Sequence, residues 1–325
     1  MATVKGAYST NTLPRYALVT CFYCNLVFIA WFAFWRIYQP TNICTEISIC
    51  PQYFIPERRN TADEFWSKVA ATFFVAASFA QFIQYMTSDK PYDLKVPIYC
   101  SACVTSIAGL SHLILAYDLL PVVMSPFGRV SHLARFGEWI AAVPLLVVMI
   151  HSLDIRDDFD HNFLIFSVCM QEISVLSGGI ASAITNYRLA VFLIIISFIT
   201  FSLLFYDLFR AGIRLLEYNA MKKNDPDFSK KKINKEGIFK SFYLTLLCCC
   251  CWSYAVAVYT LGMLHLISHE DEFVYQSVGD IVIKLFYVYV LSMGQISVLS
   301  EERLINTVRD ISSFFGKMKY MTARG

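Results

Sequence analysis

The stretch from Gly279 to Val290, GDIVIKLFYVYV, places an acid and an amine four residues apart in an otherwise apolar run. Residues i and i+4 share one face of a helix, so Asp280 and Lys284 can meet. An ammonium group in such surroundings either pairs with a carboxylate or loses its proton. Ionisable side chains at membrane depth are costly and mark a functional site by default. A structural ion pair that holds two helices together explains these two residues equally well.

A second acid lies in the segment from Ala134 to Leu146. Glu138 falls within the first two turns of an apolar stretch that begins near residue 133, and Arg135 lies one turn before it. Pro144 removes one backbone hydrogen bond and is expected to kink this helix. Glu138 and Asp280 both fall in the half of their apolar stretches that is expected to face the outside of the cell, as argued below from the basic residues. Two carboxylates that face one cation suit a positive group with little access to water.

The overall composition predicts a membrane protein. Of the 325 residues, 57% are hydrophobic and 16% are charged, whereas an ordinary soluble domain has about 25% charged residues. A helix that crosses a bilayer needs about 20 apolar residues. Eight such stretches occur, near residues 16–36, 65–87, 96–118, 133–153, 161–183, 187–216, 241–268 and 273–300. The net charge of +2 argues against nucleic acid as a partner.

The distribution of lysine and arginine predicts the orientation of these spans. Basic residues gather in the 218–240 loop and after residue 300, and they are sparse on the opposite side. Both termini are therefore expected in the cytoplasm, with the plasma membrane as the expected location. Cys44 and Cys50 then lie outside, where they could form a disulfide. Most of the other cysteines lie in apolar spans as small hydrophobic residues, and no metal site is predicted.

Aromatic residues on the seventh span suggest a binding surface. Trp252 and Tyr259 are seven residues apart and share a helix face. Lipid-facing or core aromatics are the simpler explanation, because such helices often carry them. Together with Trp139, which follows Glu138, they could instead enclose an elongated apolar ligand.

These residues together resemble a known family. The pattern from Arg135 to Pro144 (Arg, aromatic, any, acid, Trp, then Pro five residues later) resembles the third helix of the microbial (type 1) rhodopsins. Asp280 and Lys284 resemble their seventh helix, in which the lysine binds retinal as a Schiff base. Trp252 with an aromatic seven residues on is similar to the sixth-helix pocket. The segments 125–128 and 179–185 are similar to the loop before the third helix and to the fourth helix. The resemblance covers roughly residues 65–300.

The resemblance implies an all-α membrane protein, a seven-helix retinal-binding bundle that here has one extra N-terminal transmembrane helix. It implies a retinal cofactor, all-trans in the dark, attached to Lys284, with Glu138 and Asp280 as counterions. Nearby carboxylates favour the charged form of the buried nitrogen. The other residues that it implies are Arg135 and Glu172 as supporting residues and Trp139, Val143, Pro144, Gly179, Trp252, Ala255 and Tyr259 as the lining of the retinal pocket.

Some positions depart from the family pattern. Proton pumps carry an acid eleven residues after the counterion as internal proton donor, and this chain has Met149 there. Ala142 replaces the usual threonine, and Val143 follows it. Efficient outward pumping is therefore not expected. The span at 96–118 has no acid before Asp118, unlike the glutamate-lined pores of algal channels. His112 in that span is expected to be a core histidine with satisfied hydrogen bonds rather than a pocket residue.

An extra first helix, a glutamate counterion and a missing donor resemble the enzyme rhodopsins, in which a light sensor controls a cyclic-nucleotide phosphodiesterase or a guanylyl cyclase. We expect residues 1–62 to form the N-terminus, the extra helix and an outer loop, 63–300 the rhodopsin core, and 301–325 a cytoplasmic tail or amphipathic linker helix. No catalytic motif occurs, so these 325 residues are predicted not to be an enzyme.

The predicted function is that of a photoreceptor in the lipid bilayer that signals to a fused or associated cytoplasmic effector. A light-gated ion channel or a weak light-driven ion transporter is the alternative. The oligomeric state stays open, with a homodimer as one option.

Overall fold

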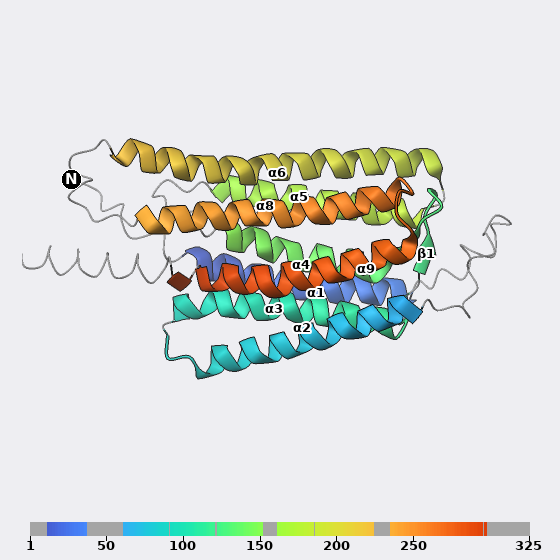
Figure 1. The fold of residues 1–325 in the computed structure, drawn as a ribbon, viewed down its shortest axis with the longest axis horizontal. Coiled ribbons are helices and arrows are strands. Elements are labelled where there is room, and N and C mark those ends of the chain that lie inside the picture. Colours follow the sequence, from blue (N-terminus) through green and yellow to red (C-terminus); the bar gives the residue numbers. More distant parts are fainter. Residues whose placement is uncertain are drawn as a thin grey trace, which may run out of the picture.

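The computed structural model describes residues 12–37, 61–90, 92–120, 122–151, 161–184, 186–223, 235–294 and 296–297. Nearly all of these residues are helical, and the helices lie almost parallel to one long axis (Figure 1). In chain order the elements are α1 (Thr12–Ile37), α2 (Thr61–Thr87), α3 (Tyr92–Ala116), β1 (Val122–Met124), β2 (Val130–His132), α4 (Leu133–His151), α5 (His161–Ala183), α6 (Tyr187–Lys223), α8 (Lys235–Met263), α9 (His269–Asp280) and the π-helix η1 (Ile281–Tyr287).

Eight helices in the described part of the chain are long and apolar enough to cross a membrane, which confirms the number of predicted spans. The last of them, His269–Gly294, contains α9, η1 and a further stretch at 288–294. It begins four residues earlier than predicted, because Ser268 caps α9 and acidic residues fill its first turn, which favour a helix start. The preceding helix α8 ends at Met263, before the predicted residue 268.

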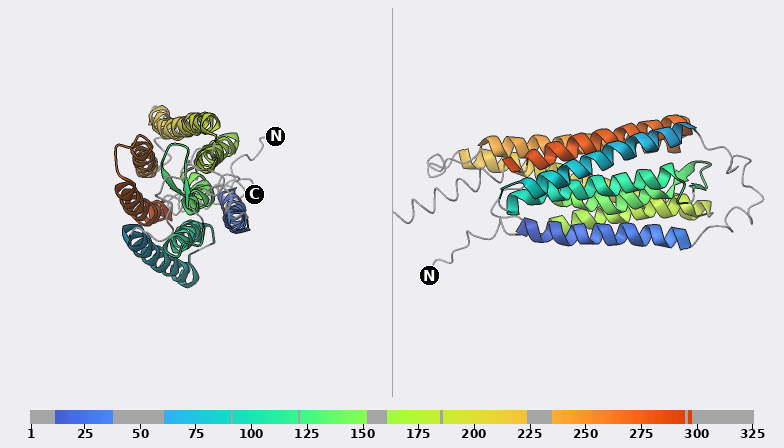
Figure 2. Two further views of the ribbon diagram at one scale, coloured as in Figure 1. Left: turned by 90° about the vertical axis from the view of Figure 1, so that its right-hand side faces the viewer. Right: turned by 90° about the horizontal axis from the view of Figure 1, so that it is seen from below.

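Seven helices form a closed ring, and the eighth lies outside it. Each of α2 to α6 packs against the next, α6 packs against α8, and α8 against α9, which returns to α2 (Figure 2). Helix α1 packs against α4 and α3. It therefore covers the outer face of α4, whose membrane-spanning window is 89% buried, against 22% for the window of α1. The extra helix makes α4, the helix of Glu138, the central element of the bundle.

A short β-hairpin closes one end of the bundle, here called the hairpin end. Strands β1 and β2 pair antiparallel, with Val122 opposite His132. The turn between them contains Gly128 at φ +72°, a conformation that glycine adopts at low cost. The sequence analysis did not predict strands here. The helices α4 and α9 both begin at this end (Figure 1).

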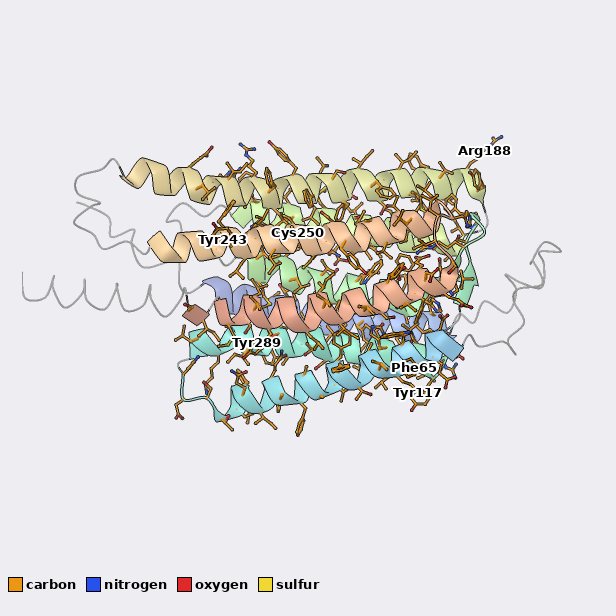
Figure 3. The ribbon with its side chains drawn as sticks, in the orientation of Figure 1. Phe65, Tyr117, Arg188, Tyr243, Cys250 and Tyr289 are labelled. Atoms are coloured by element: carbon orange, nitrogen blue, oxygen red, sulfur yellow. The ribbon has the colours of Figure 1, made fainter. Side chains whose placement is uncertain are left out.

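The outer surface of the bundle is apolar. Large hydrophobic and aromatic side chains point outward along the helices, among them Phe65, Tyr243 and Tyr289 (Figure 3). A soluble protein rarely exposes a continuous apolar surface of this extent. In a bilayer these side chains contact lipid, and the helices satisfy their own backbone hydrogen bonds. The protein is an integral, multi-pass membrane protein.

Candidate functional site

The amine of Lys284 lies in the middle of the bundle. Lys284 belongs to η1 and is 3% exposed. Lys284 Nζ donates hydrogen bonds to Glu138 Oε1 of α4 and to Asp280 Oδ1, the latter at 2.9 Å. The two carboxylates predicted from the sequence therefore both contact the one predicted amine. The amine is thus paired with two carboxylates, and a charge at this depth requires such partners.

Arg135 extends the same network toward the hairpin end. Its Nη1 donates to Asp280 Oδ2 at 3.0 Å, and its Nη2 donates to Ser277 Oγ at 2.7 Å. The guanidinium also lies over the ring of Phe273, 4.6 Å from the ring centre. Two cations and two carboxylates thus form one buried cluster whose formal charges cancel.

His112 of α3 faces this cluster. It is fully buried, and its ring stacks on Phe74 at 5.5 Å. Its Nε2 lies 3.7 Å from Asp280 Oδ2, beyond hydrogen-bond distance, and within the described residues neither ring nitrogen has a hydrogen-bond partner. His112 is a core residue as predicted, but the prediction that its hydrogen bonds are satisfied was wrong.

The backbone around Lys284 has an unusual geometry. The helix changes from α to π at Ile281 and returns at Val288, whose amide bonds the carbonyl of Ile283 five residues earlier. Short π-helical segments are rare and are frequently found at functional sites. Just before the transition, Gly279 leaves room for the ring of Tyr254 on α8. Tyr254 fixes this contact with a hydrogen bond to the carbonyl of Tyr275 at 2.9 Å.

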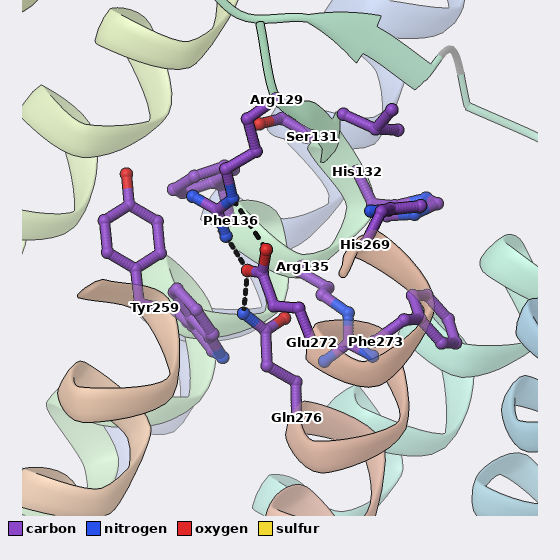
Figure 4. Close-up of a pocket in the computed structure, with 12 residues that line it drawn as sticks. Arg129, Ser131, His132, Arg135, Phe136, Tyr259, His269, Glu272, Phe273 and Gln276 are labelled. Atoms are coloured by element: carbon purple, nitrogen blue, oxygen red, sulfur yellow. Dashed lines mark hydrogen bonds and ion pairs between the residues drawn. The ribbon is translucent and has the colours of Figure 1, made fainter. Parts of the chain in front are cut away.

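The other predicted site residues are placed as follows. Trp139 and Tyr259 line one cavity together with Arg135 and Phe136 (Figure 4). Gly179 packs directly against Phe136, because a Cβ there would lie 3.2 Å from that ring. Trp252 belongs to the main buried core, and Val143 packs against that core. Pro144 is buried inside α4, and Ala255 is half-buried on α8.

Three other predictions concern an acid, a cysteine pair and a linker helix. Glu172 is buried on α5, and within the described residues neither of its carboxylate oxygens has a hydrogen-bond partner. Cys44, Cys50 and the predicted linker helix after residue 300 lie outside the described residues.

An ion pair at the hairpin end escaped the sequence analysis. Arg129 binds both carboxylate oxygens of Glu272, with Nε to Oε2 at 2.9 Å, and its guanidinium stacks on Tyr259 at 4.2 Å (Figure 4). Burial lowers the pKa of Arg129, and its contact with Tyr259 opposes that shift. The residues of this pair bound a cavity of about 20 Å³, enough for a water molecule. Charges at span ends are common, so their sequence positions gave no signal.

A buried polar cluster at the other end of the bundle was also missed. His151 Nε2 lies 3.1 Å from Ser167 Oγ, and Ser167 donates to Asp207 Oδ2. These residues belong to α4, α5 and α6. Asp207 lies inside the apolar run at 187–216, so its charge at membrane depth was a signal in the sequence.

Comparison with known proteins gives the family. The sequence profile of the family described as bacteriorhodopsin-like protein matches residues 61–298. The chain belongs to this family. The match spans all seven helices of the ring and leaves α1 outside it. No match was found among curated proteins.

Solved structures of this family share the fold. The transmembrane domain of the Salpingoeca rosetta rhodopsin phosphodiesterase aligns with a TM-score of 0.66 at 14% identity, over 86% of this chain and 98% of that one. The proton-pumping rhodopsin AR2 of the marine alga Acetabularia acetabulum aligns with a TM-score of 0.61 at 14% identity, over 74% and 98%. The thermophilic rhodopsin of Rubrobacter xylanophilus aligns with a TM-score of 0.59 at 18% identity, over 73% and 97%.

The family implies a retinal chromophore, and the residues present fit one. A covalent chromophore of this kind needs a buried primary amine and an anion beside it. Lys284 has such a buried amine, and Glu138 keeps one carboxylate oxygen, Oε2, buried without a hydrogen-bond partner among the described residues. The chain itself is a rhodopsin-like bundle that resembles the membrane domain of an enzyme rhodopsin rather than a catalytic domain.

Proposed function

We propose that this protein is a retinal-based photoreceptor in which Lys284 is the attachment site and Glu138 and Asp280 are the counterions. The observation that carries the proposal is the position of the Lys284 amine between these two carboxylates. When bound there, retinal supplies the absorption of visible light and a light-driven isomerisation. The chain's own residues hold the nitrogen in its charged form and orient and enclose the ligand.

The counterions hold the nitrogen of Lys284 in its charged form. Opposite charges within hydrogen-bond distance favour the ionised state of a buried group. Two carboxylates beside one amine would leave an excess negative charge. Arg135 balances it, because its guanidinium binds Asp280 on the side away from Lys284. Ser277 fixes the orientation of Arg135. A movement of the nitrogen would therefore alter Glu138 first, since Glu138 Oε1 accepts from Lys284 alone among the described residues.

The pocket residues orient and enclose the ligand in this proposal. Trp139, Val143 and Pro144 come from the counterion helix α4, Gly179 from α5, and Trp252, Ala255 and Tyr259 from α8. Glu172 and Arg135 support the pocket. We further propose that both termini are cytoplasmic, that the protein resides in the plasma membrane, and that retinal is all-trans in the dark.

Reconstitution tests the pigment. The full chain, purified and mixed with all-trans retinal, is expected to develop a visible absorption band, and Lys284→Ala is expected to lose it. Lys68→Ala is the matched control, because Lys68 is exposed on α2 and pairs only with Glu64 among the described residues. A band that survives in Lys284→Ala, or fails to form in the unchanged chain, would refute the proposal.

We propose that the signal passes to a cytoplasmic effector of the cyclic-nucleotide phosphodiesterase or cyclase type. Two observations support this. Alignment with the rhodopsin phosphodiesterase domain extends over 86% of the chain, against 74% for the algal pump. Position 149, eleven residues after Glu138, is a buried methionine that cannot donate a proton. Cells that express the chain are therefore expected to show no photocurrent beyond that of Lys284→Ala.

Ion transport is the second candidate, and the buried cluster of His151, Ser167 and Asp207 favours it. Ionisable groups linked by hydrogen bonds inside a bundle can carry protons. A photocurrent that disappears in Asp207→Asn but persists in an exposed variant such as Glu270→Gln would establish transport and overturn the sensor proposal.

A further inference from the structure

Three potential metal ligands from separate segments meet at the hairpin end. Asp63 belongs to the first turn of α2, His132 is the last residue of β2, and His269 is the first residue of α9. Their ligand atoms all lie within 4.8 Å of one another. Figure 4 shows the two imidazole rings side by side beside the cavity that also contains Arg135.

The two imidazoles point at the same carboxylate oxygen. His269 Nε2 lies 3.4 Å and His132 Nε2 lies 3.8 Å from Asp63 Oδ2. The rings are nearly parallel, 18° apart, with their centres at 5.6 Å. Two ligand atoms bound at 2.0–2.2 Å to a tetrahedral metal ion are separated by roughly 3.4 Å. The first distance already matches this value, and a small side-chain movement brings the second to it.

Several polar atoms of this cluster lack partners. Asp63 Oδ1, His132 Nε2 and His269 Nδ1 are buried, and within the described residues none of them has a hydrogen-bond partner; of the three, His132 Nε2 is the one that faces Asp63 Oδ2. Buried polar atoms without partners are rare and require an explanation, one of which is an ion.

We propose that Asp63, His132 and His269 form a binding site for a divalent transition metal ion of the Zn²⁺ class. Two imidazole nitrogens and one carboxylate oxygen are ligands that Zn²⁺ prefers, and three protein ligands leave a fourth position for water. Mg²⁺ and Ca²⁺ prefer sets made of oxygen alone and are expected to bind poorly. Sequence spacing predicted no metal site, because these three residues lie far apart in the chain.

Helices α2 and α9 already pack against each other, and His132 of the hairpin contacts Phe273 of α9. The ion would tie the start of α2 to the hairpin and to the start of α9. Asp280, a proposed counterion, is the last residue of α9. The ion would bind His269 and so fix the other end of the same helix. Metal binding does not depend on retinal, and this proposal stands or falls separately from the proposed function.

Zinc titration of the full chain tests the site. The protein is purified without a polyhistidine tag, stripped with a chelator, and titrated with ZnCl₂ against a chromogenic competitor. One Zn²⁺ per chain is expected, with a rise in the thermal unfolding midpoint. Asp63→Asn, His132→Asn and His269→Asn are each expected to weaken Zn²⁺ binding by at least about 10- to 100-fold. Changes of residues that only support metal ligands already cost that much affinity.

Two control variants make the result specific. His265→Asn should bind Zn²⁺ as the unchanged chain does, because His265 lies at the same end but its side chain hydrogen-bonds only the carbonyl of Phe127 among the described residues. Its backbone φ of 56° is one that asparagine tolerates. Lys68→Ala should also bind Zn²⁺ normally, because Lys68 is exposed and its side chain pairs with Glu64.

Three results would overturn the proposal. They are the absence of saturable Zn²⁺ binding to the unchanged chain, a Zn²⁺ affinity in all three ligand variants equal to that of the unchanged chain, and a rise of the unfolding midpoint with Mg²⁺ or Ca²⁺ equal to that with Zn²⁺. The comparison of the unchanged chain with and without chelator keeps the test decisive even where a ligand variant fails to fold.

Discussion

The indole of Trp31 occupies the space that a side chain at Gly137 would need. Trp31 belongs to the extra helix α1, and Gly137 precedes the proposed counterion Glu138 on α4. The indole Nε1 donates a hydrogen bond to the carbonyl of Leu133 at 2.8 Å, one turn earlier on the same helix. The extra helix is thus attached to the counterion helix at the level of the charge cluster.

Gly137→Ala is expected to destabilise the protein. The added Cβ would overlap the indole, and overpacking of this kind costs about 1–3 kcal/mol. The unfolding midpoint should fall, and in the pigment the absorption band should shift because Glu138 moves with α4. Gly212→Ala is the matched control, since a Cβ there meets only ordinary contacts at 3.5 Å or more.

The double variant Trp31→Ala with Gly137→Ala separates this contact from other effects. Trp31→Ala removes the obstacle, so the alanine at 137 should cost less in the double variant than alone, a coupling that a double-mutant cycle measures. Additive costs would mean that Trp31 does not control the position of α4.

Much of this arrangement could be predicted from the sequence, because it depends on features within one helix. Hydrophobic length gives the eight spans, and the four-residue spacing of Asp280 and Lys284 gives their contact. The two side chains meet even though a π-helical segment begins between the two residues.

The contact between Glu138 and Lys284 was implied by the family resemblance, but other contacts between helices could not be predicted from the sequence. Helices that are apolar all round carry little information about which face meets which neighbour. The fit of Trp31 over Gly137 depends on the depth and rotation of α1, and the meeting of Asp63, His132 and His269 depends on three connections at once. His112 illustrates the same limit, since its position in α3 is evident but its approach to Asp280 is not.

Glu138→Gln is expected to leave the buried cluster with one excess positive charge. Breaking one side of a buried ion network costs about 3–5 kcal/mol, so the retinal-free protein should unfold more easily. In the pigment, the amide should allow the Lys284 nitrogen to lose its proton at lower pH or shift the band to the red. Asp280→Asn should cost more, because Asp280 accepts hydrogen bonds from both Lys284 and Arg135.

Combining Glu138→Gln with Lys284→Met removes one charge of each sign and should recover part of the lost stability. Glu64→Gln serves as control, because Glu64 belongs to an exposed pair with Lys68 and such pairs contribute about 0–1 kcal/mol. If the double variant is no more stable than Glu138→Gln, the cluster does not depend on charge balance. An unchanged spectrum and titration in Glu138→Gln would assign the counterion role to Asp280 alone.

Glu272→Gln is expected to destabilise the hairpin end far more than Glu270→Gln, two residues away. The carboxylate of Glu272 binds Arg129 through two hydrogen bonds and accepts a third from Gln276 at 2.7 Å. It also fills the space left by Gly262, where a Cβ would overlap it. Loss of its charge leaves Arg129 buried and unpaired, at a cost of about 3–5 kcal/mol.

Glu270 is exposed in the same helical turn, so its change should stay within about 0.5 kcal/mol. Thermal or denaturant unfolding of the retinal-free protein measures both variants. Arg129→Met combined with Glu272→Gln should be more stable than Glu272→Gln alone, since no buried cation then lacks a partner. Equal stability of the Glu270 and Glu272 variants would show that the hairpin is held by its strand pairing and by Gly128, and that the ion pair adds nothing.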